Sequence, residues 1–241
     1  MTNRPGQHEQ LQQPWSVRMV RSVMQRNVPH RWHYEYGLMH RAIEQVWRKT
    51  GEQVYFDYVA SQVDPFIADD GSIATYRPDE YNLDQINPGR SLFTLYETTG
   101  KEKYKKAAFL LREQLRTQPR NAENGFWHKK IYPNQMWLDS IYMACPFYAQ
   151  FGHVFGEPAV FDDIALQITL LEKHARDDRT GLLYHAWDAS KQMGWANPVT
   201  GCSPHFWGRA IGWYAMAILD VLDYFPAHPR RQDITAVFQR L

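Results

Sequence analysis

The chain has 241 residues, of which 44% are hydrophobic and 22% charged, with 27 basic and 26 acidic side chains. This composition excludes a disordered chain. A formal charge of +1 gives no electrostatic reason to expect nucleic acid or an anionic membrane surface as a partner. The chain is rich in aromatic residues, with 9 Trp, 14 Tyr and 12 Phe. Aromatic side chains in such numbers build cores and also line sites that stack on sugar rings.

The cysteines and the N-terminal residues give an expectation of the cellular location of the protein. Cys145 and Cys202 are too few for a disulfide framework and are typical of reduced thiols. Residues 1–15 are polar and contain no apolar segment of a signal peptide. The longest apolar stretches, such as 141–149, are too short to span a bilayer. We therefore expect a soluble, cytoplasmic protein.

Helical periodicity runs through most of the chain, and the alternation typical of strands is scarce. A first helix is predicted over 15–26. Pairs of helices then follow in chain order, predicted over 35–49 with 52–66, 83–99 with 101–115, 134–155 with 157–175, and 205–225 with 234–241. Glycine follows the first helix of three pairs, because it readily adopts the left-handed conformation that ends a helix; these residues are Gly51, Gly100 and Gly156.

The pairs share a pattern that predicts a ring of helical hairpins. In each pair the first helix is more apolar and aromatic, and the second carries more charge. The capping glycines recur at intervals of 49 and 56 residues, which is typical of inner and outer helices in a toroid or solenoid. Long loops over 64–82, 118–133 and 177–204 each follow an outer helix. We therefore expect these loops to gather on one face and to form the site there.

Two aspartates occupy equivalent places at the entrances of inner helices. Asp84 lies at the start of the second inner helix, and Asp139 lies one turn into the third. Asp139 has apolar and aromatic neighbours in the sequence, so we expect burial to raise its pKa and to suit it to act as a general acid and then as a base. The alternative is that each aspartate caps its helix and complements the helix dipole.

Further polar and aromatic residues flank the same helices. Arg209 and Trp213 share a face of the fourth inner helix, close to Trp207. An arginine beside indole rings can bind a carboxylate while the rings stack on a sugar; alternatively, these residues pack between helices. His128 and His185 lie on loops and can donate hydrogen bonds to hydroxyls, although loop histidines often have only a structural role. No convincing metal-binding spacing and no nucleotide-binding glycine motif is present, so metal binding and nucleotide chemistry lack support in the sequence.

At these residues the sequence resembles the unsaturated rhamnogalacturonyl hydrolases of glycoside hydrolase family 105, relatives of the family 88 unsaturated glucuronyl hydrolases. The segments that carry the resemblance are HYEYGLMHRA, LDQINPGRSLFTLYETTGKEKY, GFWHKKIYPNQMWLDSIYMACPFYAQFG, GLLYHAWD and SPHFWGRAIGWYAMA. They occur in family order over nearly the whole chain. The resemblance implies an all-α (α/α)6 barrel with a central pocket and no metal or organic cofactor.

The resemblance also implies roles for individual residues. Asp139 matches the catalytic aspartate of the family, and Asp84 matches the second aspartate near the reacting end of the sugar. The positions that match substrate contacts are Tyr36, Gly37, His128, His185, Trp207, Arg209 and Trp213. The implied substrate is a short oligosaccharide from pectin whose non-reducing end is a Δ4,5-unsaturated galacturonate, with rhamnose as the leaving sugar. The implied reaction hydrates the vinyl ether of the unsaturated ring.

The chain is shorter than members of that family. We expect residues 1–241 to form a single domain with about four of the six hairpins, its C-terminal part missing and apolar flanks of the first and fourth hairpins exposed. Two other functions stay open at this point. One is an unsaturated glucuronyl hydrolase that acts on glycosaminoglycan fragments, and the other is an inactive sugar-binding remnant.

Overall fold

The structure is a computed structural model, and it describes residues 13–26 and 31–241. Residues 1–12 of the polar N-terminal segment lie outside the described residues. The helices within the described ranges are α2 (Trp15–Met24), α3 (Tyr34–Thr50), α4 (Gln53–Val63), α5 (Arg90–Thr99), α6 (Glu102–Thr117), α7 (Leu138–Phe155), α8 (Val160–Ala175), α9 (Gly208–Leu222) and α10 (Arg231–Gln239).

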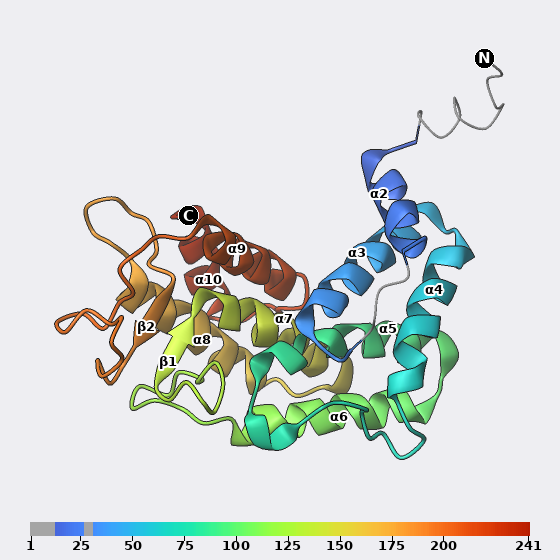
Figure 1. Ribbon diagram of the computed structural model, residues 1–241, viewed down its shortest axis with the longest axis horizontal. Helices are drawn as coiled ribbons and strands as arrows, with labels where there is room; N and C mark the ends of the chain where they lie inside the picture. Colours follow the sequence, from blue (N-terminus) through green and yellow to red (C-terminus); the bar gives the residue numbers. More distant parts are fainter. Residues whose placement is uncertain (1–12, 27–30) are drawn as a thin grey trace.

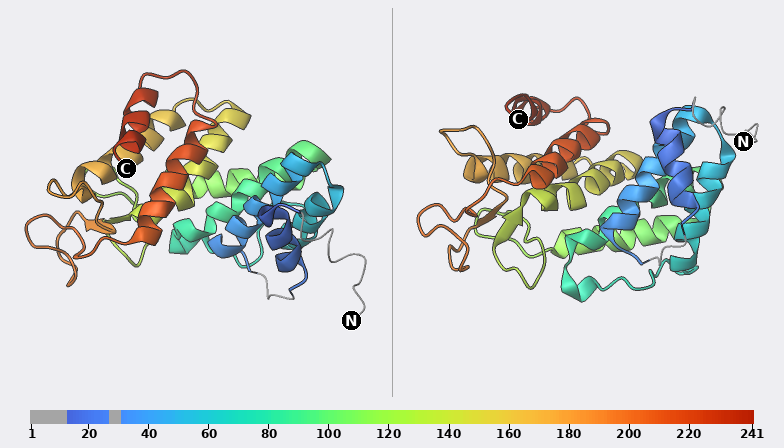
Figure 2. Two further views of the ribbon diagram at one scale, coloured as in Figure 1. Left: turned by 90° about the horizontal axis from the view of Figure 1, so that it is seen from above. Right: turned by 45° about the horizontal axis from the view of Figure 1, so that its top comes forward.

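The helices pair as the sequence predicts. Consecutive helices pack as hairpins: α3 with α4, α5 with α6, α7 with α8, and α9 with α10. The first helices of these hairpins also contact one another, α3 with α5, α5 with α7, and α7 with α9. The hairpins therefore follow one another in chain order from α3 and α4 at one side of the molecule to α9 and α10 at the other (Figures 1 and 2).

Glycine ends three of the first helices, as predicted. Gly51, Gly100 and Gly156 have φ angles of 71°, 66° and 68°, and the N–H group of each donates to a carbonyl of the preceding helix. An L side chain is unfavourable in this left-handed conformation, which glycine adopts without a steric penalty. The predicted hairpin boundaries are confirmed at these positions.

Two details of the prediction are wrong. Residues 83–99 do not form one helix, because Leu83–Gln85 (η3) and Asn87–Gly89 (η4) form 3₁₀ turns and α5 begins only at Arg90. Pro88 contributes to the break, since it has no N–H group to donate to the carbonyl four residues before it. The third inner helix likewise begins at Leu138, after the short strand β1 (Gln135–Trp137).

Strand β1 pairs with a second strand that the periodicity did not predict. In this antiparallel pair with β2 (Ala186–Asp188), Trp137 lies opposite Ala186 and Gln135 opposite Asp188. Strands of three residues carry too little alternation to be recognised in a sequence. Their pairing matters for the site, because it brings the loop before α9 against the start of α7 (Figure 1).

The long loops gather on one face, as expected. The N–H group of Lys130 donates to the carbonyl of Glu80 at 3.0 Å, which joins the loop 64–82 to the loop 118–133. The N–H group of Ala189 donates to the carbonyl of Asn134 at 3.1 Å, which joins the loop 177–204 to the start of β1. These hydrogen bonds fix the loops relative to the N-terminal ends of the inner helices.

Helix α7 lies at the centre of the core. Its residues are buried almost without interruption from Leu138 to Gly152, and it contacts α5, α8 and α9. On α9, in contrast, Met216 and Leu219 are 42% and 49% exposed. Among the helices in the described residues, none is long and apolar enough to cross a membrane.

Candidate active site

Asp139 lies in the first turn of α7, beside His185. The N–H group of Leu138 donates to the carbonyl of His185 at 3.0 Å, directly next to the β1–β2 pair. This backbone contact places Nε2 of His185 3.3 Å from Oδ2 of Asp139. The carboxylate is 14% exposed, so it is largely removed from water while one edge stays accessible. The two residues are far apart in the sequence, and the small sheet joins them.

The pKa of Asp139 is lowered, so the expectation of a raised pKa is wrong. Burial acts to raise it, but the nearby imidazoles of His185 and His128 and a backbone N–H group favour the ionised carboxylate and together outweigh burial. The aromatic neighbours in sequence predicted only the burial. In the protein without substrate, Asp139 is therefore a carboxylate at neutral pH.

Asp84 lies in the 3₁₀ turn η3 and is surrounded by cationic or potentially cationic side chains. Nζ of Lys129 lies 2.6 Å from Oδ2 of Asp84, Nε2 of His33 lies 3.7 Å from the same oxygen, and Nε2 of His128 lies 3.6 Å from Oδ1. The side chain of Asp84 is only 7% exposed. A carboxylate so well buried needs such partners, because an unpaired buried charge is strongly unfavourable. Oδ1 of Asn82 accepts the N–H group of Asp84 and fixes the turn.

His128 joins the two aspartate regions. Burial lowers its pKa to about 4, which leaves the imidazole neutral at neutral pH. Oγ of Ser140, in the first turn of α7, accepts the N–H group of Trp137 and lies 3.0 Å from Nδ1 of His128. The Ser140 hydroxyl can then donate to Nδ1, and this arrangement places the imidazole proton on Nε2, facing Asp84. The imidazole also stacks on Trp137 with ring centroids 4.4 Å apart.

Aromatic residues from three inner helices meet beside the aspartates. Trp213 of α9 contacts Tyr142 of α7 with ring centroids 4.7 Å apart, and Tyr34 of α3 edge-on at 6.1 Å. The guanidinium of Arg209 lies 5.2 Å from the ring centroid of Trp207. Trp207 is 49% exposed, which leaves one face of its ring available to a ligand.

Charged side chains near this group of rings affect the pKa of Tyr34. Burial raises the pKa of Tyr34, and the negative charges of Asp84 and Asp139 add to the rise. The positive charge of Arg209 opposes it. His128 links the two aspartate regions by contact, because its Nε2 lies 3.6 Å from Oδ1 of Asp84 and its Nδ1 lies 3.0 Å from Oγ of Ser140, the residue after Asp139.

A cavity of about 370 Å³ lies on the His185 side of this site. We call it the inner cavity, and its lining residues are Trp137, His185, Ala186, Trp195, Ser203, Pro204, His205 and Trp207. Its volume is in the range of sites for small ligands. In the described part of the chain, no group of three or more His, Cys, Asp and Glu side chains is placed to hold a metal ion.

Tyr36 and Gly37, predicted as substrate contacts, occupy a different environment. Tyr36 lines a small cavity together with Val63 of α4. Gly37 is buried, and a Cβ atom at this position would lie 2.8 Å from Cα of Pro88. Close packing of α3 on the turn η4 thus accounts for the glycine. The side chain that α3 brings to the aspartates is Tyr34.

Three residues of the site were not predicted: His33, Tyr34 and Lys129. His33 and Tyr34 stand at the start of α3, and Lys129 directly follows the predicted His128. Their roles depend on contacts with Asp84 or with α9, both distant in sequence. The only local signal was the HKK run at residues 128–130, where a basic residue next to a site histidine indicates an acidic partner.

The sequence model of Glycosyl Hydrolase Family 88 matches residues 11–241. The chain belongs to this family. The predicted resemblance and the predicted fold class, an all-α array of helical hairpins related to the α/α barrels, are confirmed.

Curated relatives resemble the chain over different lengths. An unsaturated rhamnogalacturonyl hydrolase of Bacillus subtilis, YesR, is 26% identical over 197 residues, which are 79% of this chain and 53% of that protein. A 24.9 kDa protein in the picA locus of Rhizobium radiobacter is 38% identical over 84 residues, 35% of this chain and 36% of that protein. The chain therefore matches about half or less of the length of these relatives.

Solved structures also resemble the chain. A family 105 glycoside hydrolase of Clostridium acetobutylicum has a TM-score of 0.92 and 45% identity, and the match covers 95% of this chain and 64% of that chain. The unsaturated glucuronyl hydrolase of Bacillus sp. GL1 has a TM-score of 0.70 at 14% identity, covering 93% of this chain and 65% of that chain. The second likeness concerns the fold alone.

Proposed function

We propose that the site hydrolyses oligosaccharides that end in a Δ4,5-unsaturated galacturonate, as in fragments of rhamnogalacturonan. The observation that carries the proposal is the buried Asp139 carboxylate beside His185, in a site shared with a second buried carboxylate, Asp84. The likeness to YesR, an unsaturated rhamnogalacturonyl hydrolase, supports this substrate over other unsaturated uronates. Arg209 and the exposed ring of Trp207 offer a cation and a stacking surface for an anionic sugar.

In the proposed reaction Asp139 first acts as an acid. Its carboxyl proton adds to C4 of the double bond, and the positive charge develops at C5 and the ring oxygen. The resulting carboxylate then takes a proton from water while the water oxygen bonds to C5, so that Asp139 ends protonated as it began. The hemiketal at C5 opens to a ketone, and the hemiacetal at C1 collapses to an aldehyde as the leaving sugar departs with its hydroxyl.

The lowered pKa of Asp139 means that the proton must be acquired when substrate binds. The carboxylate of an unsaturated uronate brings a like charge to the site and displaces water from it. Both effects favour the protonated form of Asp139. Nζ of Lys129 lies 2.6 Å from Asp84 and two histidines lie within 3.7 Å of it, and the carboxyl oxygens of Asp84 are suited to accept hydrogen bonds from the sugar hydroxyls.

The first test uses an unsaturated disaccharide, galacturonate linked to rhamnose, and follows the loss of ultraviolet absorption from the conjugated double bond. The Asp139→Asn variant keeps the shape of the side chain but cannot supply the proton, so we expect a loss in kcat of roughly 10²–10⁴-fold. Asp79→Asn, at an exposed aspartate on the loop before Asp84, is the matched control and should keep the wild-type rate. Normal turnover by Asp139→Asn would exclude the acid role.

A second substrate separates the alternatives. The rates of cleavage of an unsaturated chondroitin disaccharide and of the rhamnogalacturonan disaccharide are compared. Faster cleavage of the chondroitin disaccharide would identify a glucuronyl hydrolase. Thermal unfolding with and without the rhamnogalacturonan disaccharide addresses the inactive remnant. A cooperative transition whose Tm rises with the sugar, in the absence of any turnover, would indicate a binding protein. Faster cleavage of the chondroitin disaccharide would overturn the proposed specificity.

A further inference from the structure

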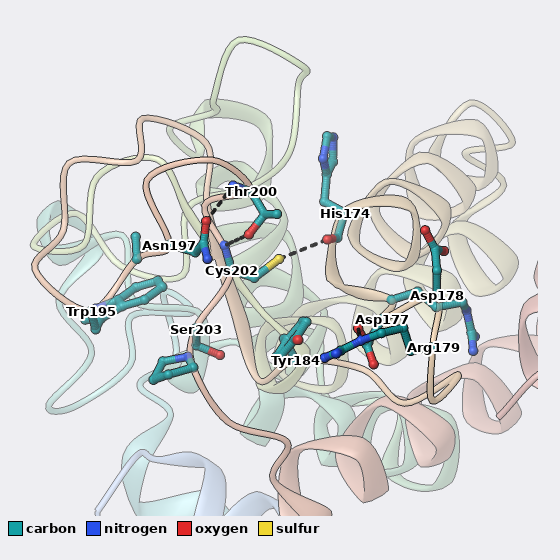
Figure 3. Close-up of a pocket in the computed structure, with 13 residues that line it drawn as sticks. His174, Asp177, Asp178, Arg179, Tyr184, Trp195, Asn197, Thr200, Cys202 and Ser203 are labelled. Atoms are coloured by element: carbon teal, nitrogen blue, oxygen red, sulfur yellow. Dashed lines mark hydrogen bonds and ion pairs between the residues drawn. The ribbon is translucent and has the colours of Figure 1, made fainter.

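A second cavity adjoins the inner cavity on the side away from Asp139. This outer cavity has a volume of about 520 Å³ and shares Trp195, Ser203 and Pro204 with the inner cavity (Figure 3). Its walls come from the end of α8 and from the loop 177–204. It is therefore large enough for a small ligand of its own, and it meets the inner cavity along a common border.

The loop that carries Trp195 is anchored at its base by Asp188. This fully buried carboxylate accepts the N–H groups of Ser190, Gln192 and Met193 at 2.9–3.0 Å. At the other end of the loop, the carbonyl of Gly201 accepts the N–H group of Asp188 at 2.9 Å. The loop is thus held from both ends, and a ring presented by a fixed loop loses little entropy when a ligand binds.

Trp195 is the aromatic surface between the cavities. It is half-buried and lines both of them, and in the described part of the chain it makes no ring contact with another aromatic residue. The packing of the core therefore does not explain the indole at this place. A ring that borders two cavities in this way is suited to stack on a sugar.

Polar groups with spare hydrogen-bonding capacity face the same cavity (Figure 3). Oδ1 of Asn197 accepts the N–H groups of Val199 and Thr200, which leaves its Nδ2 group without a partner among the described residues. Tyr184 stacks on Phe206 with ring centroids 4.6 Å apart, and its hydroxyl has no hydrogen bond within the described part of the chain. An amide donor and a phenolic hydroxyl are groups that pair with sugar hydroxyls.

The charges of the outer cavity compensate one another. Arg176 is paired with Glu172 at 2.8 Å, and Nε of Arg179 lies 3.7 Å from Oδ1 of Asp177. No excess of positive charge thus remains to select a phosphate group. The chemistry of the walls, an aromatic surface with hydroxyl-pairing groups, fits a carbohydrate.

We propose that the outer cavity binds a further sugar of the leaving saccharide, beyond the sugar directly linked to the unsaturated uronate, with Trp195 as its stacking surface and Tyr184 as a hydroxyl partner. This inference rests on the proposed function. A sugar-binding outer cavity makes the protein selective for the length of its substrate, because only a saccharide longer than a disaccharide reaches from the inner cavity into the outer one.

The test compares the unsaturated disaccharide with the unsaturated tetrasaccharide of rhamnogalacturonan. For each saccharide, kcat/KM is measured with the active chain and Kd with the Asp139→Asn variant. The values for the tetrasaccharide are then compared with those for the disaccharide. We expect the wild type to favour the tetrasaccharide roughly tenfold, the gain of one stacked ring. Trp195→Ala should abolish this preference and Tyr184→Phe should reduce it. Trp195→Phe, which keeps a ring, and Val199→Ala, an exposed residue of the same loop that lines neither cavity, should preserve it.

The outcomes separate this inference from the proposed function. A wild-type chain that leaves the disaccharide intact contradicts the proposed function, whereas affinity in the Asp139→Asn background still tests the outer cavity. Equal values for the two saccharides in the wild type overturn the outer-cavity proposal. So does an unchanged ratio in both Trp195→Ala and Tyr184→Phe. Tyr184→Phe removes only one oxygen atom, so this variant remains informative even if the loop 177–204 fails to fold in the Trp195→Ala variant.

Discussion

Replacing Gly37 by alanine tests how tightly α3 packs against the turn that leads from Asp84 into α5. A Cβ atom at this position would lie 2.7 Å from Oδ1 of Asn87, 2.8 Å from Cα of Pro88 and 2.9 Å from its nitrogen. Two of these three atoms belong to the backbone, so no rotamer change relieves the contact. Overpacking of this kind costs about 2–3 kcal/mol, and the better helix propensity of alanine offsets about 1 kcal/mol.

The net loss for Gly37→Ala is about 1–2 kcal/mol, which corresponds to a fall in Tm of about 2–8 °C for a chain of this size. Gly212→Ala is the matched control, because Gly212 also lies in a first helix of a hairpin and its Cβ would meet no atom within 4 Å. It should raise Tm by about 2–4 °C. Thermal unfolding followed by circular dichroism measures both. A Gly37→Ala variant as stable as Gly212→Ala would refute the packing described for α3 and η4.

Three further predictions concern the site. The general acid must be protonated, so kcat/KM should fall as the pH rises, and His185→Gln should move that fall to higher pH because it removes a charge that lowers the pKa of Asp139. Because the pKa of Asp139 is lowered in the folded protein, its ionised form stabilises the fold at pH values above the unfolded-state pKa. This stabilisation is lost as the pH falls through the folded-state pKa. Asp139→Asn should therefore lower Tm more at pH 7 than at pH 3. Lys129→Met removes the cation 2.6 Å from the buried Asp84 and should lower kcat/KM by at least about tenfold, whereas Lys130→Met should not.

The hairpins could be predicted because their signals are local. Apolar spacing within a helix and a glycine after it are properties of neighbouring residues, and Gly51, Gly100 and Gly156 end helices where the sequence placed them. The start of α5 could not be placed as well, because Pro88 is tolerated both in a first helical turn and in a 3₁₀ turn. The strand Gln135–Trp137 was missed because only its partner defines it.

The structure brings several of the predicted site residues together, but it differs from the prediction in their electrostatics. Both aspartates and His128 were found from their positions near helix entrances and from the family resemblance. The pKa of Asp139 was predicted in the wrong direction because the deciding neighbour, His185, is brought close only by the pairing of β1 with β2. Lys129 and His33 illustrate the same limit, since each acquires its role by contact with Asp84 from another part of the chain.

The measurement that tests the central claim most directly follows two signals from one reaction of the unsaturated disaccharide in deuterated water. Hydration of the vinyl ether predicts that ultraviolet absorption disappears at the same rate as free rhamnose is released. It also predicts that the early product carries one deuteron at C4 in a single configuration. Release of rhamnose while the double bond and its absorption persist would show attack at C1 instead, and would contradict the role assigned to Asp139.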